Sequence, residues 1–212
     1  MRRDPILRSV SSAFVTPADR AVDRLVLASA SPRRRDLLAA AGFAFDVDPA
    51  HLDESRAPDE RPAAYAERLA REKAATIAAR HPGRLVLAAD TIVVLGEQVL
   101  EKPADALDAA RMLAALSGRA HEVLTAVAIQ RGTRVRAQVA RTTVWMRAIS
   151  AAAIDAYIAT GEPFDKAGAY AIQGGAGAFV DRIEGDLDTV VGLSMAAVHD
   201  VLERIREDQP GG

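Results

Sequence analysis

Apolar residues recur along the first half of the chain in a pattern that predicts alternating strands and helices. Short apolar runs typical of buried strands occupy residues 25–28, 43–47 and 85–89. Between these runs, residues 32–41 read as a short helix, and residues 62–80 carry apolar side chains about one helical turn apart. Strands and helices alternate in this way in α/β proteins.

Strand pairs dominate the second half of the chain. Residues 92–95 and 99–100 flank Gly96 as the arms of a hairpin would, and residues 121–130 and 135–146 flank a second turn. Further helices are expected over residues 104–116, 150–160 and 192–206, with a last strand over residues 178–183. We therefore expect an α/β fold with a mixed sheet.

Residues that begin and end helices support the boundaries of two of these segments. Ser31 can cap a helix, and Pro32 suits the first helical position because the N–H that proline lacks has no partner there. Gly42 suits the left-handed stop of the same helix. Ser150 and Gly161 play the corresponding parts for the helix over residues 150–160.

Residues 1–24 mix charged residues, Ser, Thr and Pro without a clear period, so we interpret them as a loosely ordered extension. One domain over residues 25–206 and a flexible tail over residues 207–212 would complete the chain. No stretch approaches the roughly 18 apolar residues of a membrane helix, and the first residues lack the apolar block of a signal peptide. We therefore expect a cytoplasmic protein with no membrane partner.

Composition argues against several classes of function. The formal net charge of -2 offers no overall positive field for DNA or RNA, and the aromatic share of 4% argues against stacking platforms for single strands. Cysteine is absent, which excludes thiolate nucleophiles and cysteine-ligated zinc. The four histidines show no metal-ligand spacing. Any anion must be bound locally.

One local candidate is the segment Ser29-Ala30-Ser31-Pro32-Arg33-Arg34-Arg35, where a strand meets a helix N-terminus. Free backbone N–H groups and the positive end of the helix dipole favour an anion at such a point. Arginines in a first helical turn are unfavourable unless an anion offsets their charge. The segment suits a phosphate, and a solvated basic turn is the equal alternative.

Acidic candidates follow two of the strands. Asp90 lies amid apolar neighbours at an expected strand end, and burial of an ionised carboxylate is costly unless a cation, a metal or hydrogen-bond donors compensate it. The alternative is that Asp90 and Thr91 cap a turn through local hydrogen bonds. Glu54 adds a second acid in a polar loop, where most acids are simply solvated.

Lysine is confined to Lys73, Lys102 and Lys166, whereas arginine supplies the other 24 of the 27 basic residues. A lysine retained in such a sequence suggests a place for a compact ammonium group, and an ordinary surface lysine is the alternative. Gln173 lies in a run of small residues that lets a ligand approach the backbone, and its amide can both donate to and accept from a nucleobase. A flexible turn is the alternative there.

Taken together, these segments resemble the Maf family of nucleotide pyrophosphatases over about residues 25–204. The motifs occur in the family's order and read SASPRRRDLL, ESR, AREKA, AADTIVVL, EKP, LSGRAHEVLTAVA, GEPFDKAGAYAIQG and VVGL. ADTIV followed by DKAGAY and IQG is similar to the branch that acts on dTTP and UTP. The resemblance implies a two-lobed Maf/ITPase-like α/β fold, with an elongated mixed sheet flanked by helices and a central cleft, and commonly a homodimer.

The resemblance also implies roles for individual residues. Asp90 matches the family's proposed proton acceptor, and Arg33, Thr91 and Gln173 match positions linked to substrate choice. The catalytic candidates are Asp90, Glu54, Lys73 and Lys102. The substrate-binding candidates are Ser29, Ser31, Arg33, Arg34, Thr91, Lys166 and Gln173. A divalent metal, Mg²⁺ or Mn²⁺, would be held by Asp90 and Glu54. Two departures within residues 185–194, Ser194 in place of the usual Pro and the missing aromatic residue after Gly, put the helix entry or the dimer contact in question.

The resulting hypothesis is hydrolysis of dTTP and UTP to the monophosphate and diphosphate, by in-line attack of water on the α-phosphorus. Such an enzyme would remove non-standard or excess pyrimidine nucleotides. The alternative is a non-catalytic nucleotide-binding regulator of cell division, although a sensor has no need of Asp90, Glu54 and three lysines to position water. A phosphatase that releases orthophosphate is a nearer rival.

Overall fold

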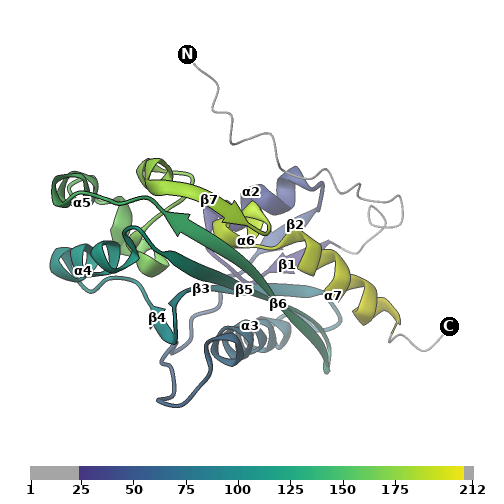
Figure 1. Cartoon of the computed structure of the whole chain (residues 1–212). Helices are drawn as coiled ribbons and strands as arrows, with labels where there is room; N and C mark the ends of the chain where they lie inside the picture. Colours follow the sequence, from purple (N-terminus) through teal and green to yellow (C-terminus); the bar gives the residue numbers. More distant parts are fainter. Residues whose placement is uncertain (1–23, 208–212) are drawn as a thin grey trace.

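The computed structural model describes residues 24–207, which form a seven-stranded mixed sheet flanked by helices (Figure 1). The extension predicted over residues 1–24 and the tail predicted over 207–212 lie outside the described residues, except for Arg24 and Glu207. The strands are β1 (Leu25–Leu27), β2 (Phe45–Val47), β3 (Val86–Leu95), β4 (Gln98–Leu100), β5 (Ala120–Arg131), β6 (Arg134–Met146) and β7 (Val180–Glu184). Their order is β2-β1-β3-β5-β6-β7, and β4 pairs with β3.

The helices connect these strands and cover both faces of the sheet. The α-helices are α2 (Pro32–Ala40), α3 (Pro62–Ala78), α4 (Ala106–Leu116), α5 (Ala151–Ile158), α6 (Leu187–Val191) and α7 (Met195–Glu207). Three 3₁₀ helices, η2 (Glu162–Asp165), η3 (Ala167–Ala169) and η4 (Gly175–Phe179), lie between α5 and β7. None of the helices described over residues 24–207 has the length and apolar character to cross a membrane.

The mixed sheet is confirmed. β1 pairs in parallel with both β2 and β3, and α2 and α3 make the two connections. All later pairs are antiparallel, including β3 with β5 and β5 with β6. The predicted second hairpin is therefore the long β5–β6 pair.

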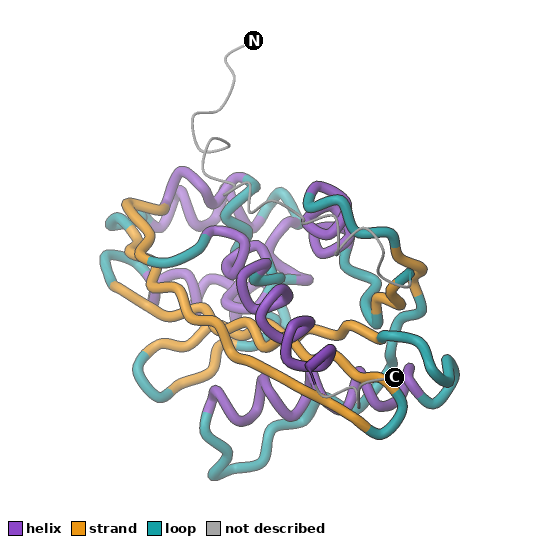
Figure 2. The backbone as a smooth tube through the Cα atoms, turned by 90° about the vertical axis from the view of Figure 1, so that its right-hand side faces the viewer, coloured by secondary structure: helices purple, strands orange, loops and turns teal. Residues whose placement is uncertain are grey.

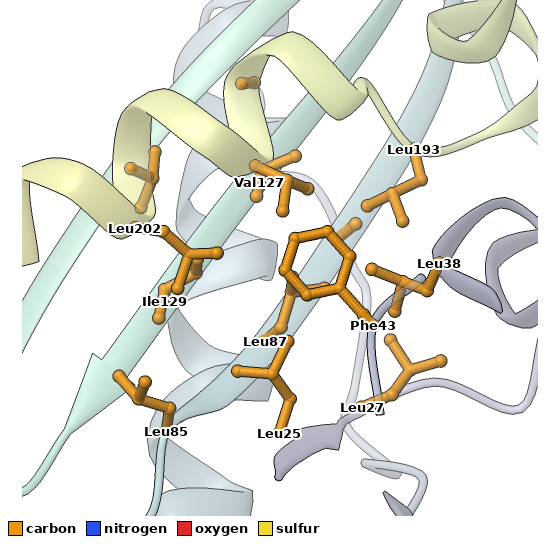
Figure 3. Packing of buried hydrophobic residues seen from close by; sticks show 14 of the residues in the cluster. Leu25, Leu27, Leu38, Phe43, Leu85, Leu87, Val127, Ile129, Leu193 and Leu202 are labelled. Atoms are coloured by element: carbon orange, nitrogen blue, oxygen red, sulfur yellow. The ribbon is translucent and has the colours of Figure 1, made fainter. Parts of the chain in front are cut away.

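Alternate residues of the central strands face two different helical layers. Leu25, Leu87 and Ile129 belong to a cluster with residues of α2 and α7, and Figure 3 shows their side chains converging with Phe43. Val26, Val86 and Ala128 point the other way, into a cluster with α3. Figure 2 shows the resulting layer of strands with helices on both sides.

A third cluster closes one end of the sheet. There Val93, Val123 and Val144 of three adjacent strands pack against α4, α5 and the segment around Tyr170. In Figure 1, α4 and α5 lie together at this end, away from α7. The sequence thus folds as one continuous sheet with different helices at its two ends.

One strand and the start of the last helix differ from the sequence-based expectation. Residues 85–89 and 92–95 were expected as separate strands, but the single strand β3, Val86–Leu95, runs through both segments. The last helix was expected from Gly192, yet it begins at Met195, because Gly192 adopts a φ of 127° and separates α6 from α7. The Oγ of Ser194 accepts a hydrogen bond from the Ala197 N–H at 3.3 Å, so this serine caps the helix that proline would otherwise begin.

The caps predicted for the other helices are partly confirmed. Pro32 occupies the first turn of α2 and Gly42 has a left-handed φ of 82°, but the Ser31 hydroxyl makes no capping hydrogen bond. Ser150 does cap α5, through a hydrogen bond from the Ala153 N–H, and Gly161 is left-handed.

Candidate active site

One edge of β3 changes partner at its middle. β1 pairs with Val86 and Leu87, and β4 pairs with residues 93–95. Between them, residues 88–92 have no strand partner on this edge within the described part of the chain. Ligands of open α/β sheets bind where neighbouring strands part in this way. Asp90 and Thr91 lie in this interval.

Asp90 and Thr91 face opposite sides of the sheet because successive strand residues alternate. Asp90 is in phase with Ala88 and Ile92, which pack against α3, whereas Thr91 is in phase with Leu87 and Ala89 of the other cluster. The two polar residues therefore meet different helices. This alternation explains how a strand can continue through two polar residues without a turn.

Lys73 of α3 meets Asp90 in a buried ion pair. The Lys73 Nζ lies 2.6 Å from the Asp90 Oδ1 and 2.7 Å from the Glu54 Oε1. Lys73 and Asp90 are each 7% exposed, while the side chain of Glu54 is 46% exposed. The ammonium thus compensates a buried carboxylate and also holds a second one at the surface.

The electrostatic environment of Glu54 favours its charged form. Burial raises the pKa of the carboxyl, but the hydrogen bond and charge of Lys73, with the charges of Lys102 and Arg34, outweigh burial and lower the pKa. Lys102 is itself exposed and is joined to the cluster through this charge interaction. Glu54 therefore remains ionised at neutral pH.

Tyr65, at one of the apolar positions of α3, fixes the loop that carries Glu54. Its hydroxyl donates to the backbone O of Glu54 at 2.6 Å and contacts the Glu101 Oε1 at 3.2 Å. Burial, together with the charge of Glu101, raises the pKa of this hydroxyl, so it stays protonated and able to donate. The phenol therefore links the Glu54 loop to the segment that precedes Lys102.

Arg34 of α2 connects the other side of β3 to the helix pair α6–α7. Its Nη1 donates to the Ser29 Oγ at 3.1 Å, its Nη2 donates to the Thr91 Oγ1 at 3.1 Å, and its Nε donates to the Gly192 O at 2.8 Å. Burial lowers the pKa of the guanidinium and the charge of Asp90 opposes that effect. Three of the five N–H donors of Arg34 are thus used within the protein, which leaves two for an anion.

A chain of hydroxyl groups continues from Arg34 across β3 and β5. Thr91 and Thr125 are direct cross-strand partners, with their Oγ1 atoms 3.0 Å apart. The fully buried Thr125 donates its proton to the Thr189 O at 2.7 Å, so Thr91 must supply the proton between the two hydroxyls. Thr91 then offers a ligand only an acceptor. Sequence reasoning missed Thr125, which has the appearance of an ordinary strand residue.

Lys166 and Arg33 lie in two segments that approach each other. The Lys166 Nζ forms an ion pair with Asp165, and the charge of Arg33 contributes to the lowered pKa of Asp165, after the hydrogen bond from Lys166 and the opposing effect of burial. The Gly168 N–H donates to the Glu101 O at 3.1 Å. This bond joins the Lys166 segment to the Lys102 segment.

The side chains of two predicted substrate residues, Ser31 and Gln173, take no part in these contacts. Ser31 is half-buried, and its backbone N–H donates to the Ser29 Oγ at 3.3 Å. Gln173 is exposed, and its side-chain amide makes no hydrogen bond to residues 24–207. The structure therefore brings Ser29, Arg34 and Thr91 together in one set of direct contacts. Glu54, Lys73 and Asp90 form a second set, whose charges interact with that of Arg34. Arg33, Lys102 and Lys166 are related to these sets through neighbouring segments.

The carboxylates suit a metal that is shared with a ligand rather than held by protein alone. No group of three or more His, Cys, Asp or Glu residues within residues 24–207 could hold a metal ion. Asp90 and Glu54 nevertheless converge on a single atom, the Lys73 Nζ. Mg²⁺ is commonly bound by one or two carboxylates together with phosphate oxygens and water, and the donor set fits that arrangement.

An open cavity of about 640 Å³ lies elsewhere, at the start of β3. It is lined by Arg24, Asp46, Pro82, Gly83, Arg84 and Arg131. Among the described residues, its one carboxylate, that of Asp46, forms ion pairs with Arg24 and Arg84. The groups with a chemical role are at the middle of β3 instead.

Comparison with known proteins adds to this geometry. The family model described as Maf-like protein matches residues 24–205. A protein of Anaeromyxobacter dehalogenans (strain 2CP-1) named dTTP/UTP pyrophosphatase is 54% identical over 186 residues, which cover 85% of this chain and 93% of the relative. Proteins of the same name from Myxococcus xanthus and Vibrio cholerae are 52% and 47% identical, over 85% and 86% of this chain and 91% and 98% of their own lengths.

Proposed function

Because the chain belongs to the Maf-like protein family, we propose that it hydrolyses dTTP and UTP to the nucleoside monophosphate and diphosphate. The observation that carries the proposal is the ion cluster of Lys73, Asp90 and Glu54 beside the Arg34 guanidinium. A carboxylate placed beside several cations is suited to act on a polyphosphate. A protein that only binds nucleotide would gain nothing from such a buried pair.

Hydrolysis requires the triphosphate to be neutralised and one water molecule to be oriented. The two remaining N–H donors of Arg34, with Arg33, Lys102 and Lys166, bind phosphate oxygens. Arg34 is suited to this because Ser29, Thr91 and Gly192 fix its plane. Phosphoryl transfer is catalysed mainly by such positioning and electrostatic stabilisation.

Asp90 accepts the proton of the attacking water, which then adds to the α-phosphorus while diphosphate leaves. Lys73 compensates the charge of Asp90 within the sheet and orients its carboxylate through the 2.6 Å contact. The buried pair therefore acts as a fixed base, and Glu54, on the solvent side of Lys73, limits where the water can lie.

A divalent cation, Mg²⁺ or Mn²⁺, would be held by Asp90 and Glu54 together with phosphate oxygens. When bound, such an ion neutralises phosphate charge and makes coordinated water more acidic. Ser29 and Ser31, with the free N–H groups at the start of α2, bind the remaining phosphate oxygens. Removal of the metal with a chelator should abolish turnover, and added Mg²⁺ or Mn²⁺ should restore it.

Product identification tests the proposed reaction. Purified protein is incubated with dTTP, UTP, CTP or GTP and Mg²⁺, and the products are separated. Release of monophosphate and diphosphate supports the proposal, whereas release of orthophosphate identifies the rival phosphatase. Replacing Asp90 with Asn should lower kcat at least 100-fold, about 2.7 kcal/mol in the barrier. Turnover within threefold of the parent would refute the role of Asp90.

Gln173 pairs with the base, because thymine and uracil present alternating acceptor and donor groups that an amide can match. Thr91, with only an acceptor to offer, contributes to the same choice. Replacing Gln173 with Glu should lower discrimination between UTP and CTP. The homodimer implied by the sequence resemblance and the cytoplasmic location expected from the hydrophobic pattern stay predictions for this chain.

A further inference from the structure

We propose that Tyr157 and Glu162 determine base selectivity by fixing the turn that carries Gln173. They are positioning residues, since neither is placed to touch the substrate itself. The inference rests on the proposed function, in which the Gln173 amide reads the base. The proposed role of Gln173 requires the exposed amide to be held in one position, and the contacts around it show what holds it.

Hydrogen bonds anchor the backbone on both sides of Gln173. The Ala171 N–H donates to the Tyr157 Oη at 3.2 Å, and the Gly175 N–H donates to the Glu162 Oε2 at 3.1 Å. The Tyr157 hydroxyl in turn donates to the Glu162 Oε1 at 2.8 Å. One phenol and one carboxylate thus hold the residues two positions before and two positions after Gln173.

Gln173 occupies the tip of the turn between these anchors. The Gly174 N–H donates to the Ala171 O at 3.0 Å, which closes a turn with Gln173 in its third position. The side chain is exposed, so the turn restricts it only through the backbone. Movement of either anchor would therefore move the amide.

Position 174 requires glycine because there is no room for a Cβ atom, not because of its backbone conformation. A Cβ atom at this position would lie 1.9 Å from the Glu162 Oε1, although the φ of -108° suits any residue. The Glu162 carboxylate thus packs directly against the backbone of the turn. Replacing Gly174 with Ala should displace this carboxylate without straining the chain.

The residues that support the turn are closely packed, and their segment contacts β3. Tyr157 is 4% exposed and meets the edge of the Phe179 ring at 5.6 Å between centroids. Burial raises the pKa of the Tyr157 hydroxyl, which remains a donor to Glu162. In the same segment Gly168 is packed so closely that an added Cβ would lie 2.9 Å from the Val93 Cγ1. Val93 is three residues from Asp90, so the turn is built on the strand that carries the proposed base.

Displacement of the turn should change the selectivity between bases more than it changes the rate of hydrolysis. A hydrogen bond between the Gln173 amide and the base is lost when the amide moves by a fraction of the hydrogen-bond length. Asp90 and Lys73 lie outside the turn, so its displacement leaves them in place. The variants Tyr157→Phe and Gly174→Ala should therefore lower the ratio of kcat/KM for UTP over CTP at least fivefold. The kcat for UTP should stay within about threefold of the parent.

A double variant shows whether Gly174→Ala acts through Glu162. Removing the carboxylate in Glu162→Ala should lower the same ratio, and adding Gly174→Ala to it should cause no further decrease, because the atom that the new Cβ displaces is already gone. Additive effects would overturn the proposed mechanism. Ile129→Val, in the buried core near the far end of β5, is the control for stability and should lower the melting temperature without changing the ratio.

The outcomes separate this inference from the proposed function. If the unaltered chain releases no diphosphate from UTP, the proposed function fails and the inference fails with it. If the unaltered chain is active and selective, but folded Gly174→Ala and Tyr157→Phe retain its UTP/CTP ratio within twofold, the inference alone is overturned. A selectivity loss in both variants with a near-parental kcat supports it.

Discussion

Lys73 of α3 and Asp90 of β3 form a buried ion pair, with 2.6 Å between the Lys73 Nζ and the Asp90 Oδ1. The pair spans the layer between helix and sheet at the interval where β3 lacks a strand neighbour on one edge within the described residues. It therefore links the stability of the fold to the arrangement of the proposed catalytic base, and the first prediction follows from this double role.

Replacing Lys73 with Met should lower the free energy of unfolding by about 3 kcal/mol or more, because it leaves the buried Asp90 carboxylate without its ion-pair partner. Urea denaturation at pH 7 measures the change. The double variant Lys73→Met with Asp90→Asn removes the uncompensated charge and should be more stable than Lys73→Met alone. Equal stability of the single and double variants would contradict the prediction.

Replacing Arg34 with Lys should lower kcat/KM for UTP by about 10-fold to 100-fold, or about 1.4 to 2.7 kcal/mol. A single ammonium cannot reproduce the planar fork that contacts Ser29, Thr91 and Gly192 at once. Arg35→Lys is the matched control, since Arg35 is the exposed neighbour in the same helical turn. Similar losses in both variants would show that total charge, rather than the fork, matters.

Replacing Thr125 with Val should lower both stability and turnover. The change leaves the Thr189 O without its donor and removes the hydroxyl that lies 3.0 Å from the Thr91 Oγ1, at a cost of about 1 to 3 kcal/mol. Thr142→Val is the control, because the fully buried Thr142 also donates to a backbone carbonyl, that of Asp186, at 2.9 Å. We expect comparable loss of stability in the two variants and a tenfold loss of kcat in Thr125→Val alone.

His121 should make the fold sensitive to mild acid. Burial lowers its pKa to about 4, from an ordinary value of 6.5. Between these values the unfolded chain binds a proton that the folded chain does not, so stability rises with pH across this window. Lowering the pH from 6.5 to 4 should cost up to about 3 kcal/mol from this one group.

His121→Gln removes the titration and retains a polar atom that can reach the Tyr170 hydroxyl, which lies 2.8 Å from the His121 Nε2. Urea unfolding at pH 4.5, 5.5 and 7 compares the two proteins. The loss of stability between pH 7 and 4.5 should be smaller in the variant. If the two proteins lose the same amount, other groups are responsible for the acid sensitivity.

The sequence pattern predicted most of the elements, and its clearest error lies at the middle of β3. The polar pair Asp90-Thr91 suggested a strand end, because two polar residues interrupt an apolar run. β3 continues through the pair since Lys73 compensates one side chain on one face and Arg34 satisfies the other on the opposite face. Neither partner can be located without the positions of α2 and α3, so local pattern could not predict the continuous strand.

Candidate residues of unusual type were easier to find than supporting residues of ordinary type. A buried carboxylate, rare lysines and an arginine cluster drew attention to Asp90, Lys73 and Arg34. Tyr65 and Thr125 were missed because a tyrosine at an apolar helix position and a threonine in a strand both suit a plain core. Their roles come from partners far away along the chain, as the contact between Tyr65 and Glu101 illustrates.

The contacts of Arg34 and Lys73 draw on Ser29, Glu54, Asp90 and Gly192, which are spread over most of the described chain. A ligand that requires these groups together has no binding site in an unfolded or half-folded chain. Mass action then makes any such ligand a conformational stabiliser, worth about 2.7 kcal/mol at a free concentration 100 times its Kd. Nucleotides that raise the melting temperature would thereby identify themselves as ligands even in the absence of turnover.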